Sequence, residues 1–296
     1  MNSKCNLCPH KCNVDRSSVR GRCSASNKIK VGLASLHYFE EPCISGKSGS
    51  GTVFFTHCNL KCVYCQNFKI SRDGFGKEIS VEELANTFLS LQEKGANNIN
   101  LVTPTVYVDK IIEAIKIARN NGLNIPIIYN SSGYENVSTI EKLNGYIDIY
   151  LPDFKYAFDD LAMKYSKVPN YSSTAKKAII AMYKQVGKPV FNEDGMLVKG
   201  VDIRHLILPE NIENSKAVLK WIKDTFNDNV LVSIMAQYFP TNKAHEFKEL
   251  NRKLTKEEYR EIEAYIDKIG LENGFIQELG EHEEEYVPNF DLSGIE

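Results

Sequence analysis

The sequence lacks three features that would point to a membrane or to nucleic acid. No run of apolar residues approaches the ~20 residues that a membrane-spanning helix requires. Lys and Arg number 36 against 38 Asp and Glu, so no excess of positive charge is present to bind a phosphate backbone. The N-terminal residues Met-Asn-Ser-Lys-Cys lack the apolar core of a secretory signal peptide. We therefore expect a cytoplasmic protein that binds neither membrane nor nucleic acid.

The composition is otherwise that of an ordinary globular protein. Hydrophobic residues make up 43% and charged residues 25% of the 296 positions, which is enough chain for one large core and a small appendage. Eight cysteines in a chain that is not exported favour metal sites over disulfides.

A three-cysteine motif follows the best-defined strand of the sequence. Residues 52–56 are β-branched and aromatic, which predicts a buried strand. Cys58, Cys62 and Cys65 follow it with the spacing C-x3-C-x2-C. Three ligands are too few for a closed tetrahedral zinc site. They suit a [4Fe–4S] cluster in which three irons each take one cysteine and the fourth iron stays open. A structural zinc loop that borrows His57 as a fourth ligand is the alternative.

This motif, with Tyr64 just before the last cysteine, resembles the radical S-adenosylmethionine (SAM) superfamily. The resemblance implies that the amine and carboxylate of SAM chelate the open iron. It also implies that the reduced cluster cleaves the sulfonium and releases a 5′-deoxyadenosyl radical. The strand context and the later segments favour this interpretation over the zinc loop.

Residues 1–45 are predicted to form a separate small metal-binding module. Cys5, Cys8, Cys12 and Cys23 have the spacing C-x2-C-x3-C-x10-C, and a Gly-Arg-Cys turn would bring the fourth cysteine back toward the others. Four thiolates can close a tetrahedral shell, so structural zinc is slightly favoured. A second [4Fe–4S] cluster uses the same ligands and stays open as an alternative.

Glycines and serines between residues 31 and 50 predict a loop that leads into the first strand. Within it, Cys43 is predicted to be a small buried hydrophobe, with a ligand role in the N-terminal site as the lesser alternative. Glu40 and Glu41 are predicted to be solvated, although they could also face an active site.

Strands and helices alternate through residues 46–296, which we interpret as the catalytic domain. This alternation implies a parallel sheet with right-handed crossovers. About six such units favour an α/β fold, a partial (β/α)6 TIM-like barrel, over a complete eight-fold barrel. A doubly wound open sheet is the competing topology. The predicted strands are 52–56, 98–103, 125–130, 146–151, 201–208, 230–235 and 275–278, and the predicted helices are 80–95, 107–120, 136–143, 159–165, 174–186, 212–226 and 255–269.

Reactive residues are expected where these strands end. Most of the superfamily has a glycine-rich motif with a glutamate after the second strand, where it meets the SAM amine; this chain has Thr103 and Thr105 around a proline. Their hydroxyls and carbonyls are still able to accept from an ammonium. Asp153 and Lys155 alternate after the fourth strand and would share one face. Activating enzymes of glycyl-radical enzymes carry a similar Asp-x-Lys that helps to hold SAM.

Arg204 lies inside an apolar strand, so it needs a buried partner. The carboxylate of SAM, held bidentately, is the partner that we predict. The neighbouring His205 would point the other way and pack as a structural histidine.

Three segments extend the resemblance: Leu-Pro-Asp-Phe-Lys-Tyr, Arg-His-Leu-Ile-Leu-Pro and Met-Ala-Gln-Tyr-Phe-Pro. They resemble the PflX group of radical SAM proteins, which is related to the pyruvate formate-lyase activating enzyme. The N-terminal Cys-Asn-Leu-Cys-Pro-His-Lys-Cys is similar to that group and to its Memo-associated relatives. The resemblance covers residues 5 to 278.

The resemblance implies an oxidoreductase that binds a [4Fe–4S] cluster and SAM and activates a glycyl-radical enzyme by abstracting hydrogen from a glycine Cα. It also implies an electron donor such as flavodoxin or ferredoxin. Radical modification of another peptide or of a small molecule is the first alternative. A non-catalytic, metal-stabilised binding protein is the second, and the open coordination position argues against it. The absence of a basic tract argues against a nucleic-acid modifier.

Overall fold

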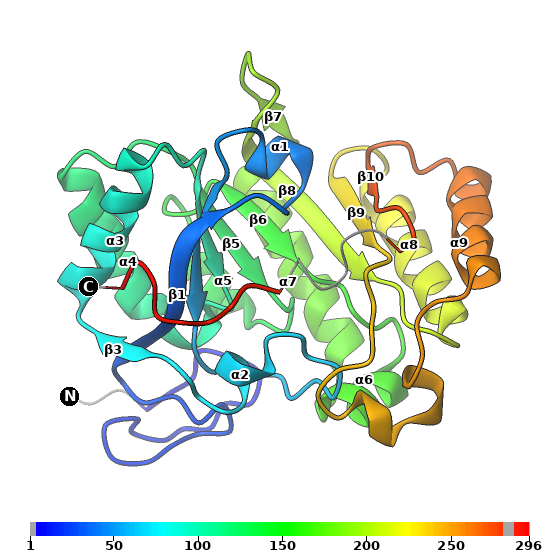
Figure 1. Ribbon diagram of the computed structural model, residues 1–296, viewed down its shortest axis with the longest axis horizontal. Helices are drawn as coiled ribbons and strands as arrows, with labels where there is room; N and C mark the ends of the chain where they lie inside the picture. Colours follow the sequence, from blue (N-terminus) through cyan, green and yellow to red (C-terminus); the bar gives the residue numbers. More distant parts are fainter. Residues whose placement is uncertain (1–3, 281–286, 296) are drawn as a thin grey trace.

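A computed structural model describes residues 4–280 and 287–295 of the chain. The described strands form one curved sheet in the order β10-β9-β8-β6-β5-β4-β2-β1-β3, with β7 paired to β8 (Figure 1). Their bounds are β1 Ile29–His37, β2 Ser50–Phe55, β3 Lys77–Ile79, β4 Ile99–Val102, β5 Ile127–Ser131, β6 Ile149–Pro152, β7 Val190–Phe191, β8 Leu197–Leu206, β9 Leu231–Met235 and β10 Gly274–Ile276.

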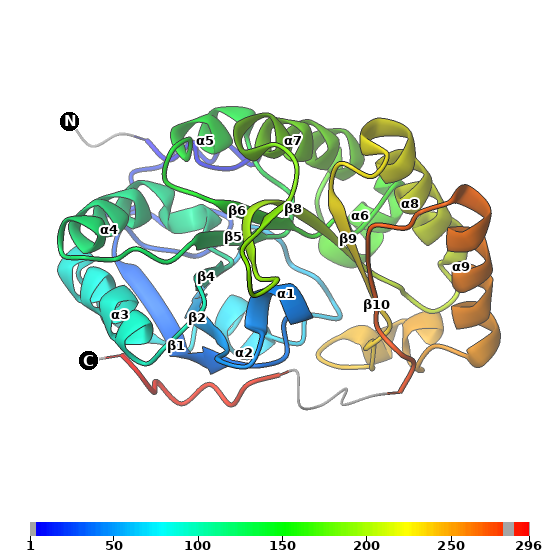
Figure 2. The same cartoon turned by 90° about the horizontal axis from the view of Figure 1, so that it is seen from above.

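The α-helices alternate with the strands along the chain, and most of them lie on one side of the sheet (Figure 2). Viewed from above, α3, α4, α5, α7, α8 and α9 form an arc around the convex side of the strands (Figure 2). The helices are α1 Pro42–Ser45, α2 Phe68–Ser71, α3 Val81–Glu93, α4 Val108–Asn120, α5 Val137–Lys142, α6 Asp159–Ser166, α7 Tyr171–Val186, α8 Ile212–Phe226 and α9 Lys256–Ile269. No helix in the described ranges is long and apolar enough to cross a membrane.

The strand order confirms the partial barrel. From β2 to β10 the neighbouring strands of the main path are parallel, and their order never reverses. A doubly wound sheet would reverse at a switch point, so that topology is excluded. The apolar stripes of the outer helices pack on the convex face, and all six residues of β2 are buried.

Sequence patterns within single helices predicted the bounds of several helices correctly. Ser80 caps α3 and accepts from the backbone N–H of Glu83, whose carboxylate accepts from the Ser80 N–H in return. This capping box is the one that the sequence predicts. The helix predicted over 212–226 has the same bounds in the structure.

The prediction of a loop from residue 31 onward is wrong for its first part. Ile29–His37 forms β1, which pairs antiparallel with β2 and β3. Its Gly32 suggested a turn, but a Cβ there would lie 2.5 Å from the side chain of Ile70, so the glycine permits close packing. Residues 4–28, in contrast, contain no helix or strand. The division into 1–45 and 46–296 stays a prediction.

The C-terminal segment returns to β1. The backbone N–H of Ala34 donates to the carbonyl of Ser293, and that of Leu292 donates to the carbonyl of Gly32. Phe290 is buried against Phe54. Residues 287–295 therefore cover the first strands of the sheet.

Candidate active site

The loop between β2 and α2, residues 56–67, carries Cys58, Cys62 and Cys65 and is called the cysteine loop below. All three cysteines line a cavity of about 760 Å³, the barrel cavity, on the concave side of the sheet. Backbone bonds hold the loop, because the N–H of Val63 donates to the carbonyl of Tyr165 over 2.8 Å. The strand end and the loop therefore bring the three predicted ligands to one site.

Each of these sulfurs has a hydrogen-bonding neighbour. The N–H of Leu60 donates to Cys58 Sγ over 3.3 Å, and the Ser166 hydroxyl lies 3.0 Å from Cys62 Sγ. The Ser71 hydroxyl lies 3.2 Å from Cys65 Sγ. Burial raises the pKa of all three thiols, that of Cys62 to about 11. A thiolate is therefore unfavourable here without a bound cation.

The donor set fits an iron–sulfur cluster better than a zinc ion. In the described part of the chain, no group of three or more His, Cys, Asp or Glu side chains could hold one metal ion. A [4Fe–4S] cluster would give each cysteine its own iron, which fits three thiols that line one cavity. His57, the alternative zinc ligand, does not line this cavity, and its ring lies against Gly74.

Buried hydroxyls extend from Cys62 into the core. The Ser166 hydroxyl lies 2.7 Å from that of Tyr156, which lies 2.6 Å from that of Tyr64. All three residues are buried. Since hydrogen bonds to cluster sulfurs tune reduction potentials, Ser166 is a residue that sequence reasoning missed. Only its position at the end of α6 beside the cysteine loop reveals it.

Asp153 and Lys155 share one face, as the sequence predicts, and their predicted contact with SAM stays a prediction. They follow β6, both line the barrel cavity, and Lys155 Nζ lies 2.6 Å from Asp153 Oδ2. The two side chains are 23% and 15% exposed, so this is not a solvated surface pair. Burial alone would lower the pKa of Lys155, but the Asp153 carboxylate outweighs burial and raises it. Lys155 is therefore a fixed cation in the cavity wall.

Tyr171, at the start of α7, holds the end of β6 and was also missed. Its hydroxyl donates to the carbonyl of Asp153 at 2.9 Å or of Ser132 at 2.7 Å, and it accepts from the N–H of Lys155 over 3.0 Å. A tyrosine at a helix start carries no sequence signal for this role. The contact fixes the backbone on which the ion pair is built.

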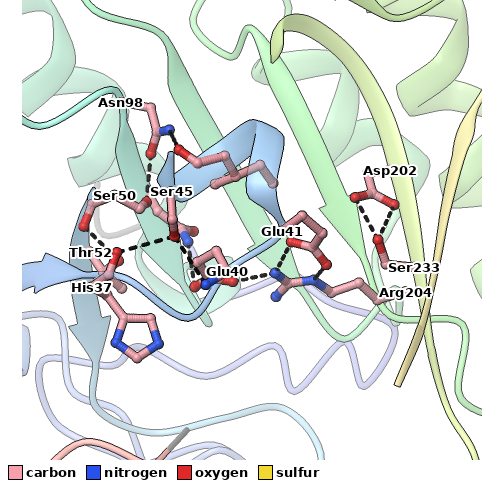
Figure 3. Close-up of polar contacts among 12 residues, drawn as sticks. His37, Glu40, Glu41, Ser45, Ser50, Thr52, Asn98, Asp202, Arg204 and Ser233 are labelled. Atoms are coloured by element: carbon pink, nitrogen blue, oxygen red, sulfur yellow. Dashed lines mark hydrogen bonds and ion pairs between the residues drawn. The ribbon is translucent and has the colours of Figure 1, made fainter. Parts of the chain in front are cut away.

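Arg204 does not face the cavity as a free cation. Its guanidinium binds Glu41 through two nitrogens, one of them Nε at 2.8 Å from Oε1, and also binds Glu40 (Figure 3). Each glutamate side chain is only 8% exposed. The other oxygen of Glu40 accepts from Asn100 over 2.9 Å. The prediction that Glu40 and Glu41 are solvated is therefore wrong. The alternative that they face the site agrees with the structure, since both line the barrel cavity as the buried partners of Arg204.

A third carboxyl group lies beside this cluster. Asp202 is fully buried, and both its oxygens lie within 3.0 Å of the Ser233 hydroxyl (Figure 3). Burial, reinforced by Glu41, raises the pKa of Asp202 well above its usual range, which favours the neutral form of this carboxyl group. Burial alone would also raise the pKa of Glu41, but Arg204 outweighs it and lowers that pKa. Two carboxylates thus share one guanidinium.

The two threonines after β4 lie in different surroundings. Thr103 lines the barrel cavity and has a positive φ of 60°. Thr105 is buried and donates over 2.5 Å to Glu135, a carboxyl group whose pKa burial raises to about 8. Thr105 is not among the residues that line the barrel cavity, so the structure brings only Thr103 to the site.

The four N-terminal cysteines share one small space. They line the N-terminal cavity of about 10 Å³, together with His10 and other residues. Burial raises the pKa of Cys8 to about 12 and also raises that of Cys23. The four residues are thus neighbours, but the finding that no group of three or more such side chains could hold one metal ion in the described ranges covers them too, so their ligation of zinc or of a second cluster stays a prediction. Cys43 lies elsewhere, buried beside Ile44 as predicted.

Comparisons with known proteins place this geometry in a family. The sequence model of the radical SAM superfamily matches residues 52–222. An uncharacterized protein of Methanocaldococcus jannaschii is 31% identical over 90% of this chain and 75% of its own length. The pyruvate formate-lyase-activating enzyme of Clostridium pasteurianum is 22% identical over 76% of this chain and 93% of its own length.

Solved structures agree on the fold. The crystal structure of Streptococcus suis SuiB bound to S-adenosylmethionine superposes with a TM-score of 0.51 and 17% identity, over 80% of this chain and 51% of that one. The chain thus spans about half the length of this solved structure. At such identity the likeness concerns the fold alone.

Proposed function

The chain belongs to the radical SAM superfamily, and from this premise we propose that Cys58, Cys62 and Cys65 hold a [4Fe–4S] cluster at which SAM is reductively cleaved. When bound, the cluster supplies one electron to SAM, which gives methionine and a 5′-deoxyadenosyl radical that takes a hydrogen atom from a substrate. We further propose that the substrate is a glycine Cα of a glycyl-radical enzyme.

One observation carries the proposal: the three thiols and the Asp153–Lys155 pair line the same barrel cavity. The thiols leave one coordination position of a four-iron cluster without a protein ligand. The ion pair offers a cation for the SAM carboxylate and an anion for its amine or ribose hydroxyls. A ligand that binds the open iron thus finds both charges in the same cavity wall.

In this proposal the protein side chains orient the ligand. Lys155 is held by Asp153, and Tyr171 holds the backbone of both, so the pair is preorganised. Thr103 adds a hydroxyl at the same wall. Arg204 is satisfied by Glu40 and Glu41, so we assign it a structural role in place of the predicted contact with SAM.

Similarity to two activating enzymes supports the glycyl-radical substrate. One is the Clostridium pasteurianum enzyme, and the other is a putative glycyl-radical enzyme activating enzyme of Methanocaldococcus jannaschii, 30% identical over 43% of this chain. In the proposed step, the C–H bond of a glycine Cα breaks and a C–H bond forms at the 5′ carbon. The products are 5′-deoxyadenosine and a glycyl radical.

The first experiment tests SAM cleavage. The full-length protein is loaded with iron and sulfide without oxygen and reduced with dithionite in the presence of SAM, and 5′-deoxyadenosine is measured by mass spectrometry. We expect product from the wild type and from Cys43→Ala, the matched control whose cysteine lies outside the cavity. We expect none from Cys62→Ala. Product from Cys62→Ala, or none from iron-loaded wild type, would overturn the ligand assignment and favour a non-catalytic binding protein.

The second experiment tests the substrate. Purified pyruvate formate-lyase is added to the same reaction, and electron paramagnetic resonance (EPR) is used to detect a glycyl radical. A radical with wild type but not with Cys62→Ala supports activation. 5′-Deoxyadenosine without a glycyl radical would contradict activation of that enzyme and favour modification of another peptide or a small molecule. Reduced flavodoxin or ferredoxin, replacing dithionite, tests the predicted electron donor.

A further inference from the structure

The N-terminal segment contacts the cysteine loop at one histidine. His10 lies between Cys8 and Cys12 in the sequence and lines the N-terminal cavity with them. Its Nε2 lies 2.8 Å from the carbonyl oxygen of Asn59. Since a carbonyl only accepts, the imidazole N–H is the donor. Asn59 directly follows Cys58, so a residue among the N-terminal cysteines binds the backbone next to a proposed cluster ligand.

Asn59 joins three parts of the site. It is 1% exposed, and its side-chain N–H donates over 2.7 Å to the carbonyl of Tyr134 in the loop after β5. Its Oδ1 lies 3.8 Å from Cys58 Sγ and 3.5 Å from the hydroxyl of Ser132, which lines the barrel cavity. A displacement of the Asn59 backbone would therefore move the polar groups around the Cys58 sulfur.

His10 also packs on the loop after β5. Its ring lies 5.4 Å from that of Tyr134, which in turn stacks on Tyr171 with a centroid distance of 6.0 Å. Tyr171 holds the backbone of Asp153 and Lys155. The histidine thus makes two separable contacts, a hydrogen bond to the cysteine loop and a ring contact toward the ion pair.

We propose that His10 is a positioning residue that links the state of the four-cysteine N-terminal site to the cysteine loop through the carbonyl of Asn59. The proposal rests on the proposed function, because Cys58 matters as a cluster ligand. Binding of a metal by Cys8 and Cys12 would fix the backbone on both sides of His10. Hydrogen bonds around a ligand orient it and tune the cluster, so a fixed His10 sets the geometry at Cys58.

Two substitutions separate the hydrogen bond from the ring contact. His10→Phe keeps a ring against Tyr134 and removes the donor, whereas His10→Gln keeps an N–H donor. Each is compared with wild type in the full-length, metal-loaded protein without SAM. Two readouts are used: amide hydrogen exchange of the peptide that contains residues 57–66, and the EPR spectrum and midpoint potential of the reduced cluster.

We expect exchange in this peptide to be roughly 2- to 12-fold faster in His10→Phe, which is the effect of losing one hydrogen bond. We expect its EPR spectrum and midpoint potential to differ from wild type, and His10→Gln to restore all three. A purely structural ring contact predicts the reverse, with His10→Phe resembling wild type. That result, or a failure of His10→Gln to restore the signals, overturns the proposal.

Cys8→Ser tests the link to the N-terminal site. We expect it to lose the N-terminal metal and to reproduce the exchange and EPR changes of His10→Phe, and we expect the double variant to show no further change. Additive effects would overturn the link. Should Cys8→Ser fail to fold, the comparison of His10→Phe with His10→Gln still decides the positioning role. Absence of a cluster EPR signal in iron-loaded wild type would instead refute the proposed function, while the exchange readout would still report on His10.

Discussion

The two ends of the barrel cavity satisfy their polar groups in different ways. At the cysteine loop, the thiols have neutral hydrogen-bonding neighbours, and Asp153 and Lys155 balance each other. At the other end, near the start of β2, Glu40 and Glu41 share the guanidinium of Arg204.

This difference distinguishes residues that can still bind a ligand from residues whose role is structural. The thiols and the Asp153–Lys155 pair can still bind an external ligand, because thiols can coordinate a metal and the ion pair can form further hydrogen bonds. A guanidinium that already holds two carboxylates has little capacity for a third. The charged residues of one cavity thus divide into those that we propose to meet a cofactor and those that hold the β1–α1 loop against β8.

The largest effect should come from Arg204→Met. Removing the cation leaves Glu40 and Glu41 buried without their partner, which we expect to lower the free energy of unfolding by about 3–5 kcal/mol at pH 7. Urea denaturation measures this value. Arg252→Met, at a partly exposed pair with Glu258, is the matched control and should cost about 0–1 kcal/mol. The dissociation constant of SAM should stay near that of wild type, and a large loss of SAM affinity in folded Arg204→Met would break the comparison.

Next in size is the effect of pH on the same cluster. The pKa of Glu41 in the folded protein lies below its ordinary value of 4.5, so its pairing contributes stability above that pH. The contribution is lost as the pH falls through the folded pKa. The difference in unfolding free energy between wild type and Arg204→Met should therefore shrink as the pH falls from 7 toward the lowered pKa of Glu41, because the unpaired buried glutamates of the variant take up protons at higher pH than those of wild type. Denaturation curves between pH 7 and 3.5 test this, and a difference that grows on acidification would refute the assigned charges.

In contrast to Arg204→Met, which is expected to lower stability and leave SAM affinity unchanged, Lys155→Met should mainly lower the affinity for SAM. It removes one proposed charged partner of SAM, which we expect to weaken binding roughly 10- to 150-fold in iron-loaded protein, as the loss of about 1.5–3 kcal/mol implies. Anaerobic equilibrium dialysis measures the dissociation constant. Lys142→Met removes an exposed lysine that pairs with Asp109 and serves as the control. An unchanged SAM affinity in Lys155→Met would assign the ion pair to structure.

The smallest effect should be that of Ser166→Ala on the cluster. Removing the hydroxyl that lies 3.0 Å from Cys62 Sγ should lower the midpoint potential by about 20–60 mV, as one hydrogen bond of 0.5–1.5 kcal/mol implies. Potentiometric titration followed by EPR detects the shift. Ser173→Ala, on the surface of α7, is the control and should leave the potential unchanged. A shift to higher potential in Ser166→Ala would contradict the role of this hydroxyl.

Predictions from short spacings agreed with the structure. The three cysteines of the cysteine loop reach one cavity because only two or three residues separate them, so their convergence is local. Asp153 and Lys155 share a face because side chains alternate along an extended chain. The strand order was predictable because strands and helices alternate, and short crossovers place consecutive strands side by side.

Predictions that required distant partners failed. Arg204 lies 163 residues from Glu41, and nothing near either residue in the sequence indicates that they meet. The β1 strand was missed because Gly32 is a turn signal locally, whereas the side chain of Ile70 explains it in the structure. Thr105 was expected at the cavity, but the short 3-10 turn Thr105–Tyr107 directs it to Glu135.

The sequence by itself determined the family chemistry of this protein, because cysteine spacing, capping boxes and strand–helix alternation are properties of neighbouring residues. Only the tertiary structure decided which charges stay available to a ligand. Burial makes an unpaired charge costly, so each buried group takes whatever partner the fold supplies. The fold supplies Glu40 and Glu41 to Arg204, Asp153 to Lys155, and His10 to the loop of Cys58.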